Sequence, residues 1–372
     1  MNHNKFVKIS TKRLLHKKNL FHNFYKKIIK FFKIKFNSIK NLRNQIQIIY
    51  EEHKLFKNLN LEISFKSISE EKYDSITFKN SYSSYLQTSA YVKAYSKDYY
   101  FYEVNASENL IGRLAINKKK YFGINIYIIN RMKLEKNFIA SNQIPKKYIY
   151  LQLIKFLKDE LKNGFLIISP LDNIKVYDPI LFLLERLFNF KPYETGLIYL
   201  DKCIEDIKKS MKPRWRRQIK NGKKLNYQIK ISERKEDIHE LINLYKREKK
   251  YEGINTSILK KWYKNSSQKD SKFIVIKAIK YLNNAEEVNG YLLFCICEST
   301  ATYLIGFFLN KNVNKYVSNI LLWESINYAK KYGCSFFDLG GIDRVKTPGI
   351  AHFKLGLNPI THKDSNLCFT WF

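Results

Sequence analysis

Three arginines stand close together near the middle of the chain, in the stretch Met211-Lys212-Pro213-Arg214-Trp215-Arg216-Arg217-Gln218-Ile219-Lys220. Arginine suits phosphate binding because its planar guanidinium donates two parallel hydrogen bonds to phosphate oxygens. On a helix, the three-residue spacing of Arg214, Arg217 and Lys220 puts them on one face. Two interpretations stay open: a face that binds phosphate, or a basic helix surface that contacts only solvent.

A long helix is predicted in the last quarter of the chain. Its apolar residues recur at helical spacing, at Ile320, Trp323, Ile326 and Tyr328. Ser318 or Asn319 is expected to cap its N-terminus. Gly333 is expected to end it, because glycine adopts the left-handed conformation that is common just past a helix C-terminus.

The segment after this helix, Ser335–Leu339, is predicted to be a strand that delivers Asp338 to its end. There Gly340 and Gly341 allow the backbone to turn sharply or to approach a ligand closely. Asp338 is therefore a candidate for substrate binding. The segment that follows, 347–356, is predicted to be a loop.

Residues 1–50 hold thirteen Lys and Arg and no Asp or Glu. Apolar residues recur among the lysines at helical spacing, at Phe21, Phe24, Tyr25, Ile28, Phe32 and Phe36. A basic amphipathic helix of this kind suits an anionic lipid surface or RNA. The alternative is a helix packed on the first domain with its lysines in solvent, and periodicity does not separate the two.

The chain has 372 residues, 45% of them hydrophobic, which is enough for two domains with their own cores. Its formal charge of +34 favours anionic partners: RNA, a phosphorylated substrate or an anionic membrane surface. Five cysteines fit neither a disulfide framework nor zinc-site spacing, so we expect a reducing compartment and no metal. With no run of 18 apolar residues and no signal peptide, we expect a cytoplasmic protein, with peripheral contact with the inner face of the membrane if the N-terminal helix binds lipid.

Strands and crossing helices are predicted to alternate in both halves of the chain. Predicted strands cover 99–104, 110–117, 124–130, 165–169, 195–200, 273–278, 290–297, 301–309 and 335–339, and predicted helices include 147–162 and 179–188. A helix end, a glycine and a strand recur in each half, at Gly164 and at Gly333. The pattern predicts an α/β protein with a mixed sheet in each half.

The order of these parts resembles the C-terminal half of the FemABX family of aminoacyltransferases. The similar residues are Leu321-Leu322-Trp323-Glu324, Ala329-Lys330, Gly333, Asp338-Leu339-Gly340-Gly341-Ile342 and Phe353-Lys354-Leu355-Gly356. The resemblance implies tandem GNAT-like acyltransferase domains. We expect a basic N-terminal arm over residues 1–60, a first domain over 61–210 and a second over 211–372 that carries the Phe-Lys motif.

The resemblance also makes Lys354 and Phe353 the candidate catalytic residues. A lysine ammonium can stabilise a carbonyl oxygen as it becomes an oxyanion, or clamp a phosphate, and a neighbouring phenylalanine excludes water. The alternative is that Phe353 belongs to the core and Lys354 is a solvated loop residue.

Two further segments look like motifs of the same family. Residues 84–91 are similar to its Q-S-x-x-W stretch, which makes Gln87 a candidate for substrate binding. Residues 211–220 are similar to a segment in which arginine contacts phosphate, and this favours the binding role for Arg214, Arg216 and Arg217.

The activity implied by the resemblance is transfer of an amino acid from aminoacyl-tRNA to an amine of a peptidoglycan precursor, a nucleotide- or lipid-linked muropeptide. DNA is not an expected partner. Attack of an amine on an activated ester is downhill and needs positioning and a cation rather than a cofactor. Acetyl-CoA is the less favoured donor, because the segments 137–142 and 310–315, where a pyrophosphate-binding loop would lie, contain no glycine.

Two other classes of function stay open. One is an acyl-CoA-dependent N-acyltransferase of the GNAT type that acts on an envelope sugar or lipid. The other is a non-catalytic protein that binds RNA or a membrane. A transfer assay that compares charged tRNA with acetyl-CoA as donor separates these classes.

Overall fold

The computed structural model describes residues 61–78, 81–121, 123–141, 144–160, 164–169, 193–248, 253–266, 270–282, 285–309, 316–363 and 368–371. The N-terminal arm predicted for residues 1–60 and the helix predicted over 179–188 lie outside these ranges. None of the helices in the described ranges is long and apolar enough to cross a bilayer.

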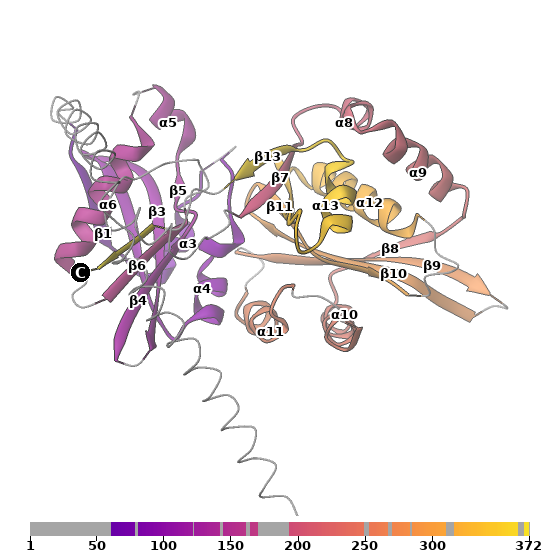
Figure 1. Cartoon of the computed structure of the whole chain (residues 1–372), viewed down its shortest axis with the longest axis horizontal. Helices are drawn as coiled ribbons and strands as arrows, with labels where there is room; N and C mark the ends of the chain where they lie inside the picture. Colours follow the sequence, from indigo (N-terminus) through magenta and orange to yellow (C-terminus); the bar gives the residue numbers. More distant parts are fainter. Residues whose placement is uncertain are drawn as a thin grey trace, which may run out of the picture. The chain divides into compact units, whose positions relative to one another are not determined.

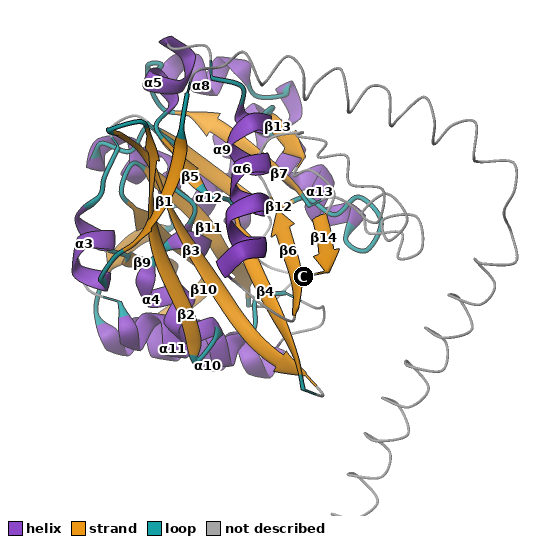
Figure 2. Ribbon diagram, turned by 90° about the vertical axis from the view of Figure 1, so that its left-hand side faces the viewer, coloured by secondary structure: helices purple, strands orange, loops and turns teal. Residues whose placement is uncertain are grey.

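The strands form two mixed sheets (Figures 1 and 2), as the sequence predicts. Sheet A has the order β1-β2-β3-β4-β6-β14, with β5 paired to β3. Its strands are β1 (Ile63–Ser67), β2 (Asp98–Ala106), β3 (Asn109–Tyr121), β4 (Ile124–Asn130), β5 (Lys133–Leu134), β6 (Gly164–Ser169) and β14 (Cys368–Trp371). The helices of this half are α3 (Glu70–Ser75), the 3-10 helix η1 (Tyr85–Gln87), α4 (Ser89–Tyr95), α5 (Lys136–Ser141) and α6 (Lys146–Glu160).

Sheet B has the order β13-β7-β12-β11-β10-β9-β8. Its strands are β7 (Glu194–Tyr199), β8 (Gln228–Ser232), β9 (Lys272–Leu282), β10 (Ala285–Cys297), β11 (Thr300–Phe308), β12 (Phe336–Gly341) and β13 (Ile360–Lys363). The helices of this half are α8 (Ile204–Ser210), α9 (Pro213–Lys223), α10 (Lys235–Glu248), α11 (Thr256–Asn265), α12 (Val317–Tyr332) and α13 (Pro348–Leu355). In each sheet one neighbouring pair is parallel, β4 with β6 and β11 with β12, and the other pairs are antiparallel.

Strand pairing crosses the domain limit predicted between residues 210 and 211. The strand β7 precedes this limit in the chain but pairs with β12 and β13 in sheet B. The strand β14 follows it but pairs with β6 in sheet A. The predicted limit therefore does not separate the strands of the two sheets, because hydrogen bonding between strands is not visible in the pattern of a single strand.

Sheet B is covered by helices on both faces (Figure 1). On one face α9 and α12 bury Trp215, Ile219 and Trp323 against the strands. On the other face α10 and α11 bury Leu241 and Trp262, together with residues of α4. A sheet covered on both faces needs nearly continuous apolar strands, as in the second half of β10.

The end of α12 is as predicted, but its start is not. Gly333 has φ of 94°, and the N–H of Cys334 donates to the carbonyl of Ala329, which closes the helix with a left-handed cap. The N-cap is Tyr316, with φ of 75° and no capping side chain, so neither Ser318 nor Asn319 has that role.

Gly164 does not repeat the role of Gly333. It is the first residue of β6, where it pairs with Asn125. An added Cβ would lie 2.7 Å from the Asn125 carbonyl oxygen. The two glycines thus occupy similar places in the sequence for different reasons, close strand packing at Gly164 and a left-handed turn at Gly333.

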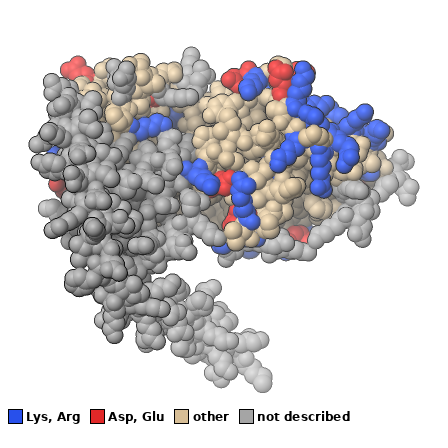
Figure 3. All heavy atoms as spheres, turned by 45° about the horizontal axis from the view of Figure 1, so that its top comes forward, with Lys and Arg blue, Asp and Glu red and all other residues tan. Residues whose placement is uncertain are grey.

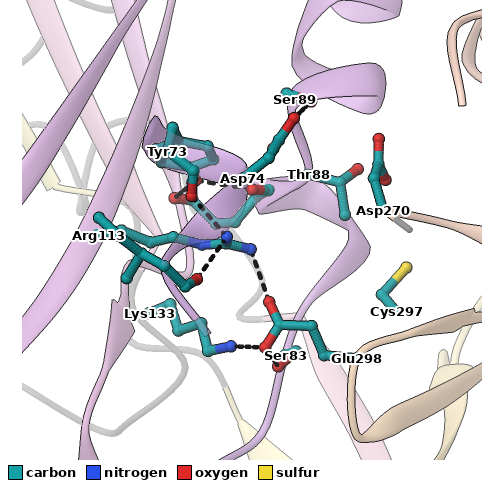
Figure 4. Close-up of polar contacts among 12 residues, drawn as sticks. Tyr73, Asp74, Ser83, Thr88, Ser89, Arg113, Lys133, Asp270, Cys297 and Glu298 are labelled. Carbon is teal, nitrogen blue, oxygen red and sulfur yellow. Dashed lines mark hydrogen bonds and ion pairs between the residues drawn. The ribbon is translucent and has the colours of Figure 1, made fainter. Parts of the chain in front are cut away.

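A partly buried carboxylate joins the two halves. Glu298, in the turn between β10 and β11, contacts Arg113 of β3 at 2.7 Å and also Lys133 of β5 (Figure 4). The cations are 5% and 3% exposed. Burial lowers the pKa of Lys133 to about 8, even though the Glu298 charge acts in the opposite direction. Glu298 therefore compensates two positive charges that have been removed from water.

We expect Glu298→Gln to destabilise the protein by on the order of 3 kcal/mol, because both cations would stay buried without a counter-charge. Glu286→Gln is the matched control, since Glu286 pairs with Lys230 at the surface, where the side chains are 41% and 43% exposed. The control should change stability by less than about 1 kcal/mol. Urea unfolding measures both, and equal effects would contradict the role of Glu298.

Candidate functional site

The Phe-Lys motif lies on a helix rather than in the predicted loop. Pro348 begins α13, where a missing N–H does no harm, and the helix runs to Leu355. Lys354 is 6% exposed and Phe353 packs partly buried in the core of sheet B. The alternative in which Lys354 is a solvated loop residue is wrong, because its position on α13 directs the side chain inward.

The Lys354 ammonium lies where β11 and β12 separate. These strands pair only from Thr300 to Thr302, and beyond that point β11 continues while β12 bulges between Asp338 and Gly341. Gly340 makes this bulge with φ of 67°. Lys354 Nζ donates to the Gly341 carbonyl oxygen at 2.9 Å and lies 4.9 Å from the centre of the Tyr303 ring.

Burial is the main influence on this ammonium. It lowers the pKa of Lys354 to about 8, and the negative charge of Asp338 acts weakly in the opposite direction. In the described part of the chain, the Gly341 carbonyl is the one hydrogen-bond acceptor of Lys354. An ammonium has three N–H donors, so this group can donate further hydrogen bonds to an oxygen that enters the site.

Asp338 lies inside β12 rather than at the predicted strand end, because the strand continues to Gly341; its side chain is 2% exposed and engaged by the protein. Its Oδ1 accepts hydrogen bonds from the Gly340 N–H at 2.8 Å and from the Thr195 hydroxyl. Its Oδ2 accepts one from the Tyr82 hydroxyl at 2.6 Å and lies 3.7 Å from the Arg131 guanidinium. In this arrangement the carboxylate shapes the bulge beside Lys354.

The arginine segment forms α9, and Trp215 attaches that helix to α13. The indole N–H of Trp215 donates to the Phe353 carbonyl at 2.8 Å, and the two rings lie 5.1 Å apart. An added Cβ on Gly356 would lie 2.1 Å from the Trp215 ring, which explains a glycine there. The Lys212 N–H also donates to the Gly356 carbonyl at 3.0 Å.

The three arginines of α9 have different surroundings. Arg216 donates to the carbonyls of Lys209 and Met211 and so satisfies the C-terminal end of α8. Arg214 and Arg217 are exposed. Cationic side chains gather on the surface formed by α8 and α9 (Figure 3). This surface has a shallow hollow, which is lined by Lys208, Arg216, Arg217, Ile219, Lys220 and Lys223.

Gln87 lies away from this group of residues. Its side-chain amide donates to the Ala115 carbonyl at 3.2 Å and accepts from the Ala115 N–H at 2.9 Å, which joins η1 to β3. It is 2% exposed. The structure thus brings Lys354, Phe353 and Asp338 together, links them through Trp215 to the arginines, and leaves Gln87 within the first half.

Four residues around Asp338 and Lys354 were not among the sequence candidates: Tyr82, Arg131 and Thr195, which contact Asp338, and Tyr303, which lies beside Lys354. Each is contributed by a different part of the chain, and none belongs to a recognisable motif. Trp215 stood inside the arginine segment, where its single apolar ring among cations marked the inward face of α9. The described residues also contain no group of three or more His, Cys, Asp or Glu side chains placed to hold a metal ion.

Comparison with solved structures places the fold among tandem GNAT-like proteins. The crystal structure of FemX matches with a TM-score of 0.61 at 14% sequence identity, and the match covers 83% of this chain and 97% of FemX. At this identity the likeness establishes the fold alone. No protein-family model matches the chain, and no curated protein matches it in sequence.

Two other solved structures match more weakly. A tandem GNAT protein from the clavulanic acid biosynthesis pathway has a TM-score of 0.45 at 8% identity and covers 83% of this chain and 98% of its own. L-PGS from Bacillus licheniformis has a TM-score of 0.42 at 12% identity and covers 75% and 88%.

Lys354→Met tests the cost of the buried ammonium. Because the folded-state pKa of about 8 lies below the unfolded value of about 10.4, the ammonium is destabilising below pH 8 and this effect disappears as pH rises to about 10.4. We expect the Met variant to be at least as stable as wild type at pH 7. Between pH 8 and 10 the free energy of unfolding of the wild type should increase relative to that of the Met variant.

Urea unfolding at each pH is the measurement, and Lys331→Met, at an exposed position on α12, is the control. A Met variant that is clearly less stable than wild type at pH 7 would contradict this account. It would mean that the ammonium stabilises the fold on balance.

Proposed function

We propose that this protein is an aminoacyltransferase that moves an amino acid from aminoacyl-tRNA to an amine of a peptidoglycan precursor. The observation that carries the proposal is the buried Lys354 ammonium at the separation of β11 and β12, in a FemX-like fold. A charge in this position strengthens any interaction with an oxyanion, because little water competes for it.

The reaction needs few groups from the protein. The acceptor amine attacks the ester carbonyl carbon, a C–N bond forms, and the C–O bond to the terminal ribose of the tRNA breaks. The amine loses a proton and the ribose oxygen gains one. Because the Lys354 pKa of about 8 lies above neutral pH, the group is mostly charged at pH 7 and can donate a hydrogen bond to the tetrahedral oxyanion.

Phosphate groups of either substrate suit the outer face of α9. Arg214 and Arg217 are exposed there, and Arg217 lines the hollow together with Arg216 and four other side chains. The nucleotide part of a muropeptide and the backbone of tRNA both present phosphate, and arginine recognises both in the same way. We assign this face to an anionic substrate and leave the choice between the two to experiment.

The decisive test is single-turnover transfer with Lys354→Met and a saturating tRNA-linked donor. Loss of an oxyanion partner should lower the rate by on the order of a hundredfold. Lys330→Met is a matched control, because Lys330 also donates to a backbone carbonyl, that of Leu200 at 2.7 Å. Wild-type turnover by Lys354→Met would remove the assignment, and a loss confined to donor affinity would make Lys354 a phosphate clamp.

The same assay with acetyl-CoA in place of charged tRNA tests the donor. Transfer from acetyl-CoA and none from charged tRNA would replace the proposal with an acyl-CoA-dependent N-acyltransferase. Transfer from neither donor, with RNA or lipid binding retained, would favour a non-catalytic binding protein.

A second test uses the different surroundings of the arginines. Arg217→Glu should raise the KM of the phosphate-bearing substrate at least tenfold and leave the melting temperature nearly unchanged. Arg216→Glu should lower the melting temperature as well, because two carbonyls near the end of α8 lose their donor. If Arg217→Glu leaves the KM of both substrates unaltered, the outer face of α9 is a solvated surface.

A further inference from the structure

The residues that hold Asp338 come from both halves of the chain. Tyr82 precedes η1, and Arg131 follows β4 of sheet A, whereas Asp338 lies within β12 of sheet B. Tyr82 donates to Asp338 Oδ2 at 2.6 Å, and Arg131 donates to the Tyr82 oxygen at 2.8 Å. The three side chains therefore form a connected unit with one buried negative and one buried positive charge.

The backbone on the first-half side is fixed by hydrogen bonds. The Ser83 N–H donates to the Thr300 hydroxyl at 3.0 Å, and the Ser299 hydroxyl donates to the Ser81 carbonyl at 2.7 Å. These bonds hold Tyr82 from both sides. Its side chain therefore reaches Asp338 from a stretch that the turn before β11 already holds in place.

Arg131 is fixed in a different way. Its φ of 52° is uncommon for a residue with a Cβ, and its N–H donates to the Ser169 carbonyl at 2.8 Å. The guanidinium lies 4.8 Å from the centre of the Tyr193 ring and is 3.7 Å from Asp338. Arg131 therefore combines an uncommon backbone conformation with a side chain that points at the Asp338 carboxylate.

The second-half side leads from Asp338 to Lys354. Asp338 accepts from the Gly340 N–H, which sets the left-handed turn of the bulge, and the next residue, Gly341, presents its carbonyl to Lys354 Nζ. A rotation of this turn would move the acceptor of the ammonium. Each step in this path is a hydrogen bond or a peptide unit, so a displacement of Asp338 reaches Lys354 over a short distance.

We propose that Tyr82 and Arg131 are positioning residues for Lys354, which act by holding Asp338 and through it the Gly340–Gly341 turn. The proposal rests on the proposed function only for the role of Lys354 in transfer. The positions of Tyr82, Arg131 and Asp338 do not depend on which donor is used.

The groups that face Lys354, and the groups around Asp338, determine how the pKa of Lys354 changes in each variant. They are Asp338 and the Gly341 carbonyl on β12 and the Tyr303 ring on β11, with Arg131, Tyr82 and Thr195 surrounding Asp338. The positive charge of Arg131 partly cancels the negative charge that Asp338 presents to the Lys354 ammonium. Without Arg131 the ammonium is held more strongly, so the pKa of Lys354 should rise. Loss of the Tyr82 hydrogen bond should act in the same direction, because the carboxylate charge is then less well compensated.

The experiment compares Tyr82→Phe and Arg131→Met with Tyr291→Phe. Tyr291 is a matched control because its hydroxyl also donates to a carboxylate, that of Glu240 at 2.9 Å, on a residue outside this site. Two quantities are measured: transfer kinetics, and the pH dependence of trace acetylation of Lys354 by acetic anhydride, followed by peptide mass spectrometry. The second does not require transfer activity.

We expect both site variants to lower kcat by roughly tenfold or more at nearly constant KM, and to shift the midpoint of Lys354 acetylation to higher pH. Arg131→Lys, which retains the charge, should return the midpoint toward that of wild type. Tyr291→Phe should change neither quantity. This split between kcat and KM is what a group acting through Lys354 produces.

The proposal is overturned if Tyr82→Phe and Arg131→Met change only the melting temperature and match Tyr291→Phe in the acetylation midpoint. It is also overturned if Arg131→Lys and Arg131→Met shift the midpoint equally. If Tyr82→Phe fails to fold, the two Arg131 variants decide the question. A wild-type protein without transfer activity would remove the proposed function, while the acetylation midpoints would still decide whether Tyr82 and Arg131 position Lys354.

Discussion

A carboxylate removed from water must be surrounded by donors and positive charge, and at Asp338 these come from both halves of the chain. Two donors, Thr195 and the Gly340 N–H, belong to sheet B, and the other two groups, Tyr82 and Arg131, belong to the first half. The interaction therefore exists only when the halves are folded together. The geometry around Lys354 depends on it, because the bulge that bears the Gly341 carbonyl begins at Asp338.

Glu298 makes a second ionic contact between the halves. Its carboxylate, in a turn of the second half, compensates Arg113 and Lys133 of sheet A. Two carboxylates, buried Asp338 and partly buried Glu298, thus bind the second half to the first, and each has buried cationic partners that would be costly to leave alone. Such pairs contribute little net stability compared with an apolar contact, but they penalise any displaced arrangement of the halves. The result is a fixed relation between Tyr82, Arg131 and β12.

Much of this architecture could be predicted from local sequence patterns. The strand β4 covers Ile124–Asn130, as predicted, and the αL cap at Gly333 follows from one glycine after a basic helix end. The partners of Asp338 could not be predicted, because Tyr82 and Arg131 are far away in sequence and lie in no periodic pattern. The helix α13 was missed because it has only eight residues and begins with Pro348 and Gly349, a pair that is typical of turns and loops. The sheets to which β7 and β14 belong could not be predicted either, because the sequence of a single strand does not show which strand it pairs with.

The two faces of α9 constrain which substrates fit the proposed function. The inner face holds Trp215 against Phe353, and the exposed Arg214 and Arg217 lie on the outer side. An anion bound to these exposed arginines would lie across α9 from Phe353, and an α-helix with its side chains is about 10 Å across. A small molecule such as acetate cannot span that distance. A substrate that contacts both these arginines and Lys354 must be extended, with phosphate at one end and the reacting carbonyl or amine at the other, and both a tRNA acceptor end and a nucleotide-linked peptide have this form.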